Sequence, residues 1–216
     1  MIITKQKSLD VILKMLEAKN KVFIIGCGDC AATCKTGGEE EVKKMAEFLG
    51  SHGKQITGFV VPESTCVSAK TKTALAKHRK ALTESDCCLV LACGSGVQCA
   101  RESDRCNIEY YPGCDSLFAA WVDSSGGFKE VCSTCGECVL DLTQGICPVT
   151  RCAKGLLNGP CGGQNKGKCE VDKNRDCAWI LIYNKMAQQG QVDLLRRITP
   201  AKDRRGSAKP REMKLF

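Results

Sequence analysis

Cysteine is the residue type that most constrains this chain, because 18 of its 216 residues are Cys. Core packing does not need so many thiols, so most of them must be paired as disulfides or bound to metal. We do not expect an export signal, since the first 20 residues scatter four lysines and contain no unbroken apolar region. The apolar runs elsewhere are strand-sized and fall short of the ~18 residues that cross a bilayer. We therefore expect a cytoplasmic protein without a membrane span, in which the thiols bind metal.

The formal net charge of +8 is unevenly distributed. Residues 201–216 carry six Lys or Arg against two Asp or Glu, which is half of the excess. A basic tail that contains Pro, Gly and Ser is typical of a solvated or partner-wrapping segment. Because the rest of the chain is only weakly basic, no nucleic-acid role is expected.

The first 125 residues predict a small α/β domain with a Rossmann-like parallel sheet. Apolar residues at helical spacing after the N-cap candidate Ser8 indicate an amphipathic helix over 8–19. Apolar runs, glycine-containing turns and helical segments then alternate, which favours right-handed crossovers with helices on both faces of the sheet. The predicted strands are 22–26, 56–61, 87–92 and 107–111, and the predicted helices between them are 38–52, 69–82 and 94–101.

From Ser124 the composition shifts to closely spaced Cys, Gly and Pro, as far as about Cys177. Such a segment buries little apolar surface and needs staples, which thiolate–metal bonds supply. Helical periodicity returns over 176–189. We expect residues 126–200 to form a cysteine-rich, loop-rich iron–sulfur module with a C-terminal packing helix, followed by a basic tail over 201–216.

The strongest local signal is CSTCGEC, in which two residues separate Cys132 from Cys135 and Cys135 from Cys138. Thiolates at this spacing converge on one four-iron cluster, as in bacterial ferredoxins. The gap of eight residues before Cys147-Pro is longer than in ferredoxins and leaves the fourth ligand open. Four further cysteines follow, at Cys152, Cys161, Cys169 and Cys177. Eight cysteines are the number that two four-iron clusters require, and structural zinc bound by four thiolates is the alternative.

A second constellation follows the first predicted strand, in the turn GCGDCAATC. Its G-x-G-x-x-A pattern matches a dinucleotide-binding turn, but no acidic residue ends the second strand, and three cysteines are unusual in a pyrophosphate clamp. We interpret Cys27, Cys30 and Cys34 as a metal cradle, since loops after neighbouring parallel strands meet at one edge of a sheet. Cys66, Cys93 and Cys114 follow the second, third and fourth strands, and one of them is expected to complete this site. Cys66 and Cys93 are preferred, because their strands should lie closest to the first.

No catalytic set emerges from the other residues. His52 and His78 fall on predicted exposed helix positions, and the sequence contains no Walker or G-x-S-x-G motif. If the chain takes part in catalysis, we expect it to carry electrons rather than to break bonds. A thioredoxin-type role for the CGDC pair is a minor alternative. Cys87 and Cys88 begin a predicted buried strand and are interpreted as core residues.

The C-terminal half carries a family resemblance. The string CPVTRCAKGLLNGPCGG, continuing through GKCEVDKNRDCAWILIY, resembles the cysteine-rich methylenetetrahydrofolate reductase C-terminal domain family. With GCGDCAATCKTGGEEEV and LACGSGVQ as a looser match, residues 5–195 resemble the small iron–sulfur subunits (MetV) of acetogen-type methylenetetrahydrofolate reductases. The resemblance carries the family's motif cysteines over to Cys27, Cys30, Cys34, Cys132, Cys135, Cys138, Cys147, Cys152, Cys161, Cys169 and Cys177.

The resemblance implies a non-catalytic electron-transfer subunit in an oxidoreductase complex. Its partner would be a catalytic subunit that carries FMN and reduces 5,10-methylenetetrahydrofolate to 5-methyltetrahydrofolate in the Wood–Ljungdahl pathway of one-carbon metabolism. This chain would relay electrons to or from that flavin, and a further electron-donor subunit is expected. The implied cofactors are two or three [4Fe–4S] clusters, with zinc as the alternative metal at one site. The competing hypothesis is a zinc-stabilised scaffold or interaction protein without redox activity.

Overall fold

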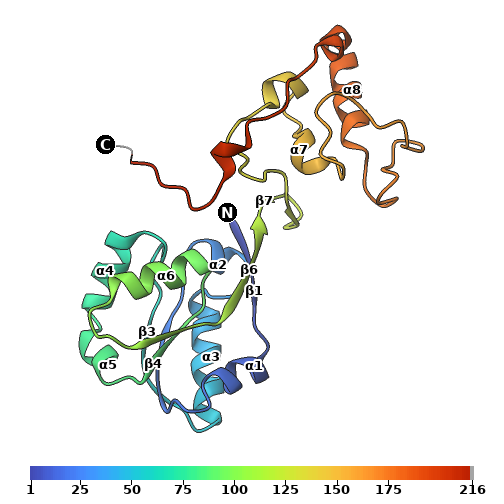
Figure 1. The fold of residues 1–216 in the computed structure, drawn as a ribbon. Coiled ribbons are helices and arrows are strands. Elements are labelled where there is room, and N and C mark those ends of the chain that lie inside the picture. Colours follow the sequence, from blue (N-terminus) through green and yellow to red (C-terminus); the bar gives the residue numbers. More distant parts are fainter. Residues whose placement is uncertain (215–216) are drawn as a thin grey trace. The chain divides into compact units, whose positions relative to one another are not determined.

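The structure is a computed structural model that describes residues 1–214, so Leu215 and Phe216, at the end of the predicted tail, lie outside the described residues. The chain divides into two compact units, Met1–Phe118 and a second unit from Ala119 onward. The first, which we call the α/β unit, is a sheet flanked by helices, whereas the second consists of loops around a few short elements (Figure 1). Within residues 1–214, no helix is long and apolar enough to span a bilayer.

The main sheet of the α/β unit is parallel throughout and has the strand order β3-β2-β4-β5. Strand β2 therefore lies between β3 and β4, so the loops that follow these three strands meet at one edge of the sheet. The predicted strands are all present, with their ends shifted by at most two residues. Their bounds are Lys21–Ile25 for β2, Gln55–Val60 for β3, Cys87–Val90 for β4 and Glu109–Pro112 for β5.

Helices cover both faces of this sheet, as the alternation in the sequence predicts. Alternate residues of β2 point to opposite faces, so Ile24 joins one core cluster and Phe23 the other. Helices α1 (Leu9–Met15) and α3 (Glu39–Ser51) pack on the first face, and α4 (Ser68–Ala76), α5 (Arg79–Thr83) and α6 (Gly94–Ser103) on the second. Cys87 and Cys88 lie in these cores and are fully buried, as expected.

The single helix predicted over 69–82 is wrong, because α4 ends at Ala76 and α5 begins at Arg79. The break turns the chain at His78, whose ring centroid lies 5.7 Å from that of the buried Phe23. It also allows Leu75 and Leu82 to enter the same core cluster. His78 is therefore half-buried rather than solvent-exposed, whereas His52 is exposed as expected.

A second, two-stranded sheet was not predicted. Strand β1 (Ile2–Gln6) pairs with β6 (Cys114–Ala119). The pairing brings Thr4 Oγ1 within 2.6 Å of Thr36 Oγ1, so the chain start lies against the segment that follows the cysteine-rich turn. The first strand of the main sheet is therefore the second strand of the chain.

The second unit contains little regular structure besides one long helix. Its elements are the hairpin of β7 (Trp121–Val122) and β8 (Phe128–Lys129), α7 (Pro148–Arg151), α8 (Ala178–Gln188) and 3₁₀ turns at Leu140–Thr143, Val192–Arg196 and Arg204–Ser207. Helix α8 lies within the span predicted for it, and its buried residues Trp179, Ile182 and Met186 form a small core with Cys177. The loops of this unit thus pack around one helix.

Candidate metal centres

The turn after β2 is held by its own backbone. The amide of Gly26 donates to Val60 O, that of Cys27 to Gly37 O and that of Gly28 to Pro62 O, each at 2.8 Å. A phosphate-binding turn needs such N–H groups free to face its ligand. In this turn they join the loops at the sheet edge instead, and the helix that follows, α2 (Cys30–Thr33), has only four residues.

Two glycines allow this close packing. A Cβ atom at Gly26 would lie 2.5 Å from Gly37 O, and one at Gly37 would lie 1.8 Å from Leu91 O. Any side chain at either position would force the backbones apart. The Gly residues around the cysteine-rich turn therefore allow the backbones of the loops after β2 and β4 to pack closely together.

Four cysteines from the loops after β2, β3 and β4 gather at this edge, and we call Cys27, Cys30, Cys66 and Cys93 the N-terminal cysteine group. Partial burial raises the pKa of the Cys66 thiol although the residue as a whole is exposed, and the nearby Cys93, Cys27 and Cys30 thiols act in the same direction. Burial likewise raises the pKa of Cys30, with further contributions from Asp29, Cys27 and Cys93. Cys27 and Cys93 themselves are buried. Both completing residues predicted from the sequence, Cys66 and Cys93, thus lie near the CxxC pair.

Cys34 has other neighbours. Its Sγ lies 4.0 Å from the carbonyl oxygen of Ile2 on β1, and its thiol also interacts with that of Cys114. Cys114 is buried, which raises its pKa to about 12, and its Sγ donates to Thr36 O at 3.5 Å. These contacts of Cys34 lie on the β1–β6 side, where Cys114, the third candidate from the sequence, is its neighbour.

In the second unit, four cysteines line one hollow of about 240 Å³, which we call the first cysteine hollow. They are the three cysteines of the CSTCGEC loop and the one before Pro148, namely Cys132, Cys135, Cys138 and Cys147. The rest of the wall is largely apolar and includes Val131, Val139, Leu140 and Val149. Low polarity around a metal group limits solvent access and tunes its potential.

Backbone groups of the CSTCGEC loop contact the sulfur atoms of its own cysteines. Thr134 has a φ of 52°, which is unusual for a β-branched residue, and its amide lies 3.4 Å from Cys132 Sγ. Gly136 has a φ of 89°, and a Cβ there would lie 3.0 Å from Gly206 O. Strained backbone of this kind is often found at functional sites.

Most of the described part of the basic tail is exposed, as expected, but two of its side chains contact this loop. The Lys202 ammonium contacts Glu137 O, and its side chain is only 4% exposed. Arg211 Nη1 donates to Thr134 O at 2.9 Å. Two tail cations therefore bind the carbonyl groups of the loop that carries Cys132, Cys135 and Cys138.

The other four cysteines line a second, much smaller hollow of about 20 Å³, the second cysteine hollow. These residues are Cys152, Cys161, Cys169 and Cys177. Backbone amides of Asp172 and Val171 lower the pKa of Cys169, with a smaller contribution from Arg175. Trp179, which also lines the hollow, donates from Nε1 to Leu156 O at 3.0 Å and so fixes α8 against the loops. The eight cysteines thus separate, in chain order, into two sets of four.

The donor chemistry of all three groups fits a thiophilic metal. Thiolate-only sets of four favour iron–sulfur clusters or zinc over magnesium or calcium. Among residues 1–214, no three His, Cys, Asp or Glu side chains are close enough together to hold a single metal ion as they stand.

Comparison with known proteins adds one finding. Residues 111–205 match the family model described as methylene-tetrahydrofolate reductase C terminal. The match covers less than half of the chain, but it includes both cysteine hollows. Neither the curated proteins nor the solved structures gave a match. The cysteine-rich part of the chain is thus similar to a domain associated with methylenetetrahydrofolate reductase.

Proposed function

We propose that this chain is the iron–sulfur electron-transfer subunit of a methylenetetrahydrofolate reductase complex. It would relay electrons to or from the flavin of a catalytic partner subunit, which interconverts 5,10-methylenetetrahydrofolate and 5-methyltetrahydrofolate. The observation that carries the proposal is the first cysteine hollow, where four thiols line one space inside the segment that is similar to the reductase domain. A cytoplasmic location, the Wood–Ljungdahl pathway and a separate electron donor belong to the same proposal.

The room in each hollow favours a different metal group. Four thiols around about 240 Å³ suit the eight-atom core of a [4Fe–4S] cluster. The second hollow, at about 20 Å³, holds little more than one water-sized body, which suits a single zinc ion bound by four thiolates. The N-terminal cysteine group, with its CxxC pair and two cysteines from neighbouring strands, supplies the thiols for a second cluster. We therefore assign two clusters and one zinc ion to the chain.

When bound, a four-iron cluster supplies one-electron transfer at a potential that its surroundings set. In the first hollow, the apolar side chains of Val139 and Val149 form part of the wall, while Cys132 and Cys138 are exposed to solvent. The Thr134 amide, 3.4 Å from Cys132 Sγ, stabilises negative charge on that sulfur. Lys202 and Arg211 place two positive charges beside the same loop. The amide dipole and the two positive charges all favour the reduced, more negative state of the site.

Metal analysis of protein purified without oxygen tests the proposal. We expect about eight irons and eight acid-labile sulfides per chain, with about one zinc, from two four-iron clusters and one four-thiolate site. The protein should be brown with broad visible absorbance. A colourless protein with little iron and several zincs would refute the electron-transfer proposal and favour the zinc-stabilised scaffold.

Cysteine variants locate each metal. Cys135→Ser should remove about four irons and leave the zinc, whereas Cys169→Ser should remove the zinc and leave the iron. Cys99→Ser is the matched control, because Cys99 is half-buried on α6 and lines neither hollow. It should change neither metal. Unchanged iron in Cys135→Ser would contradict the assignment of the first hollow.

Mixing experiments test the relay itself. The reduced chain is mixed without oxygen with a flavin-bearing methylenetetrahydrofolate reductase catalytic subunit, and the flavin absorbance near its visible maximum is followed. We expect bleaching with the wild-type chain and with Cys99→Ser, and none with Cys135→Ser. If a fully iron-loaded chain leaves the flavin oxidised while forming a complex with it, the relay role is wrong.

A further inference from the structure

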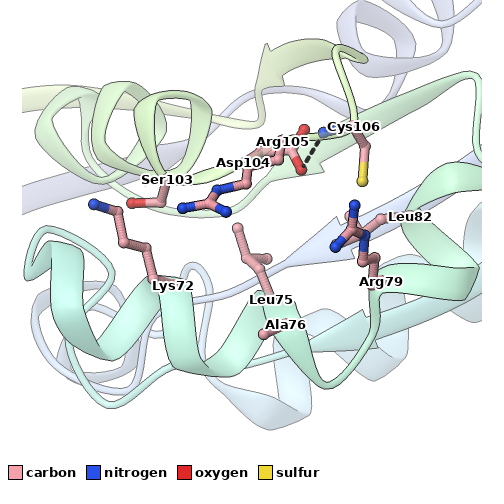
Figure 2. A pocket seen from close by; sticks show the side chains of 9 residues that line it. All are labelled: Lys72, Leu75, Ala76, Arg79, Leu82, Ser103, Asp104, Arg105 and Cys106. Carbon is pink, nitrogen blue, oxygen red and sulfur yellow. Dashed lines mark hydrogen bonds between the residues drawn. The ribbon is translucent and has the colours of Figure 1, made fainter.

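A pocket of about 230 Å³ lies on the α4–α5–α6 face of the α/β unit (Figure 2). Its walls come from α4, from the start of α5 and from the segment where α6 ends. The lining residues are Lys72, Leu75, Ala76, Arg79, Leu82, Ser103, Asp104, Arg105 and Cys106. Neither cysteine hollow nor the N-terminal cysteine group shares a residue with it.

Three cationic side chains line this pocket from three different places in the chain. In the view of Figure 2, the Ser103 hydroxyl lies between the Lys72 ammonium and the Arg105 guanidinium, and the Arg79 guanidinium lies beyond Leu75. Within residues 1–214, these three side chains have no ion pair and donate no hydrogen bond, in contrast to the nearby Lys70, which pairs with Glu63 at 2.7 Å. Like charges that share one pocket repel unless an anion lies between them.

The pocket holds one carboxylate of its own, Asp104, which can offset only one of the three positive charges. Asp104 Oδ1 accepts a hydrogen bond from the Cys106 amide at 2.9 Å, which fixes it within its own turn. Two of the three positive charges therefore remain uncompensated. The surrounding chain adds to the field, since residues 66–83 contain five Lys or Arg and no Asp or Glu.

The floor of the pocket is apolar. Leu75 lies between the Arg105 and Arg79 side chains in the view of Figure 2, Leu82 lies beside Arg79, and both leucines are almost fully buried. An apolar lining of this kind favours an organic ligand over a bare inorganic ion. Ligand sites commonly combine such an apolar lining with a few convergent polar groups.

We infer that this pocket binds a small organic oxyanion that carries at least two negative charges. Arg79 and Arg105 present planar donor groups that match phosphate or carboxylate oxygens in pairs, and Lys72 adds a third cationic contact. The Ser103 hydroxyl, which lies beside these cations, adds a neutral hydrogen-bonding group to the lining. The inference does not depend on the metal content of the chain.

The place of the pocket indicates an effector site rather than part of the electron path. Helix α6 begins directly after Cys93, and the pocket lies at its other end, about 15 Å away along a ten-residue helix. A ligand bound there touches α4, α5 and the segment after α6, and so ties together three elements of one face of the sheet. Its binding therefore stabilises the α/β unit by mass action.

Calorimetric titration of the full, metal-loaded chain with pyrophosphate and with citrate tests the inference, with glycerol as the neutral comparison. We expect saturable binding of one or both anions at moderate salt, and none of glycerol. Tighter binding of pyrophosphate assigns a phosphate ligand, and tighter binding of citrate assigns a carboxylate ligand. No saturable binding of either anion at millimolar concentration would overturn the inference.

Charge-removing variants locate the site. Arg105→Gln and Lys72→Gln should each weaken binding by about tenfold or more, because each removes one charge-assisted contact. Lys77→Gln and Lys80→Gln are the matched controls, since both residues are exposed basic positions beside the same helices but do not line the pocket. They should change binding less than about twofold, the effect expected of distant screened charges. Equal weakening by all four variants would overturn the inference, because it would show that a diffuse basic surface binds the anions. Binding of heparin without binding of the small anions would overturn it for the same reason.

Discussion

The contact that joins the loops after β2 and β3 offers a sharp test of how the sheet edge is held. Thr65 is fully buried, and its Oγ1 donates to Gly26 O at 2.7 Å. Cys66 follows Thr65, and Cys27 follows Gly26, so this hydrogen bond fixes two members of the N-terminal cysteine group relative to each other. Thr65→Val keeps the shape of the side chain and removes only the donor.

The expected cost follows from the burial of the contact. A buried carbonyl that loses its donor costs about 1–3 kcal/mol of unfolding free energy. Hydrogen–deuterium exchange of peptides from β2 and β4, the most protected part of the sheet, measures this loss in the α/β unit. In the metal-loaded protein, Thr65→Val should also speed the loss of iron to a chelator, since it loosens the position of Cys66.

Thr73→Val is the matched control. Thr73 is exposed on α4, and its Oγ1 donates to Ala69 O within its own helix. Its replacement should change the unfolding free energy by less than about 0.5 kcal/mol. If Thr65→Val and Thr73→Val have the same effect, the argument that the Thr65 hydrogen bond holds the sheet edge is refuted.

Three further predictions concern packing and pH. Gly37→Ala should destabilise the α/β unit by about 3 kcal/mol or more, since its Cβ would meet Leu91 O at 1.8 Å, whereas Gly50→Ala, with no atom within 4 Å, should stabilise it by about 0.5–1 kcal/mol; urea unfolding measures both. Trp179→Phe should cost the second unit about 1–2 kcal/mol in thermal unfolding, because Leu156 O loses its donor, and equal stability would contradict this. Burial raises the pKa of Cys87 to about 11, so the stability that its neutral thiol contributes is complete below the pKa of the unfolded chain and is lost as pH rises to about 11. Cys87→Ala should therefore flatten the decline of the unfolding free energy over this pH range. An unchanged slope of unfolding free energy against pH would refute this.

The main sheet was predictable because its signals are local. Strand β2 is apolar from Val22 to Ile25, as a strand buried on both faces requires, and a glycine-containing turn follows it. The neighbours of β2 also followed from the chain order, since consecutive strands of such folds are commonly adjacent. Cys66 and Cys93 could therefore be assigned to the same edge as Cys27 before any coordinates were known.

Contacts between distant segments were not predictable in this way. The pairing of β1 with β6 joins residues more than 100 positions apart. Apolar and polar residues alternate too weakly along β1 to predict that it pairs with another strand. The break before α5 has a similar origin. No Gly or Pro marks it, and the packing of His78 on Phe23 overrides a continuous helical pattern.

The cysteine-rich segment shows which contacts the spacing of cysteines in the sequence can predict. CSTCGEC identified three thiols of one group, because two-residue gaps bring neighbouring side chains to one centre. The fourth, Cys147, follows a turn in which Gln144 and Gly145 both have positive φ angles, and no spacing rule contains such a turn. The basic tail shows the same limit. Composition favoured a solvated or partner-wrapping segment, and most of the described tail is exposed, but the Lys202 side chain is only 4% exposed because its ammonium contacts Glu137 O of the cysteine-lined loop, a contact that composition does not indicate.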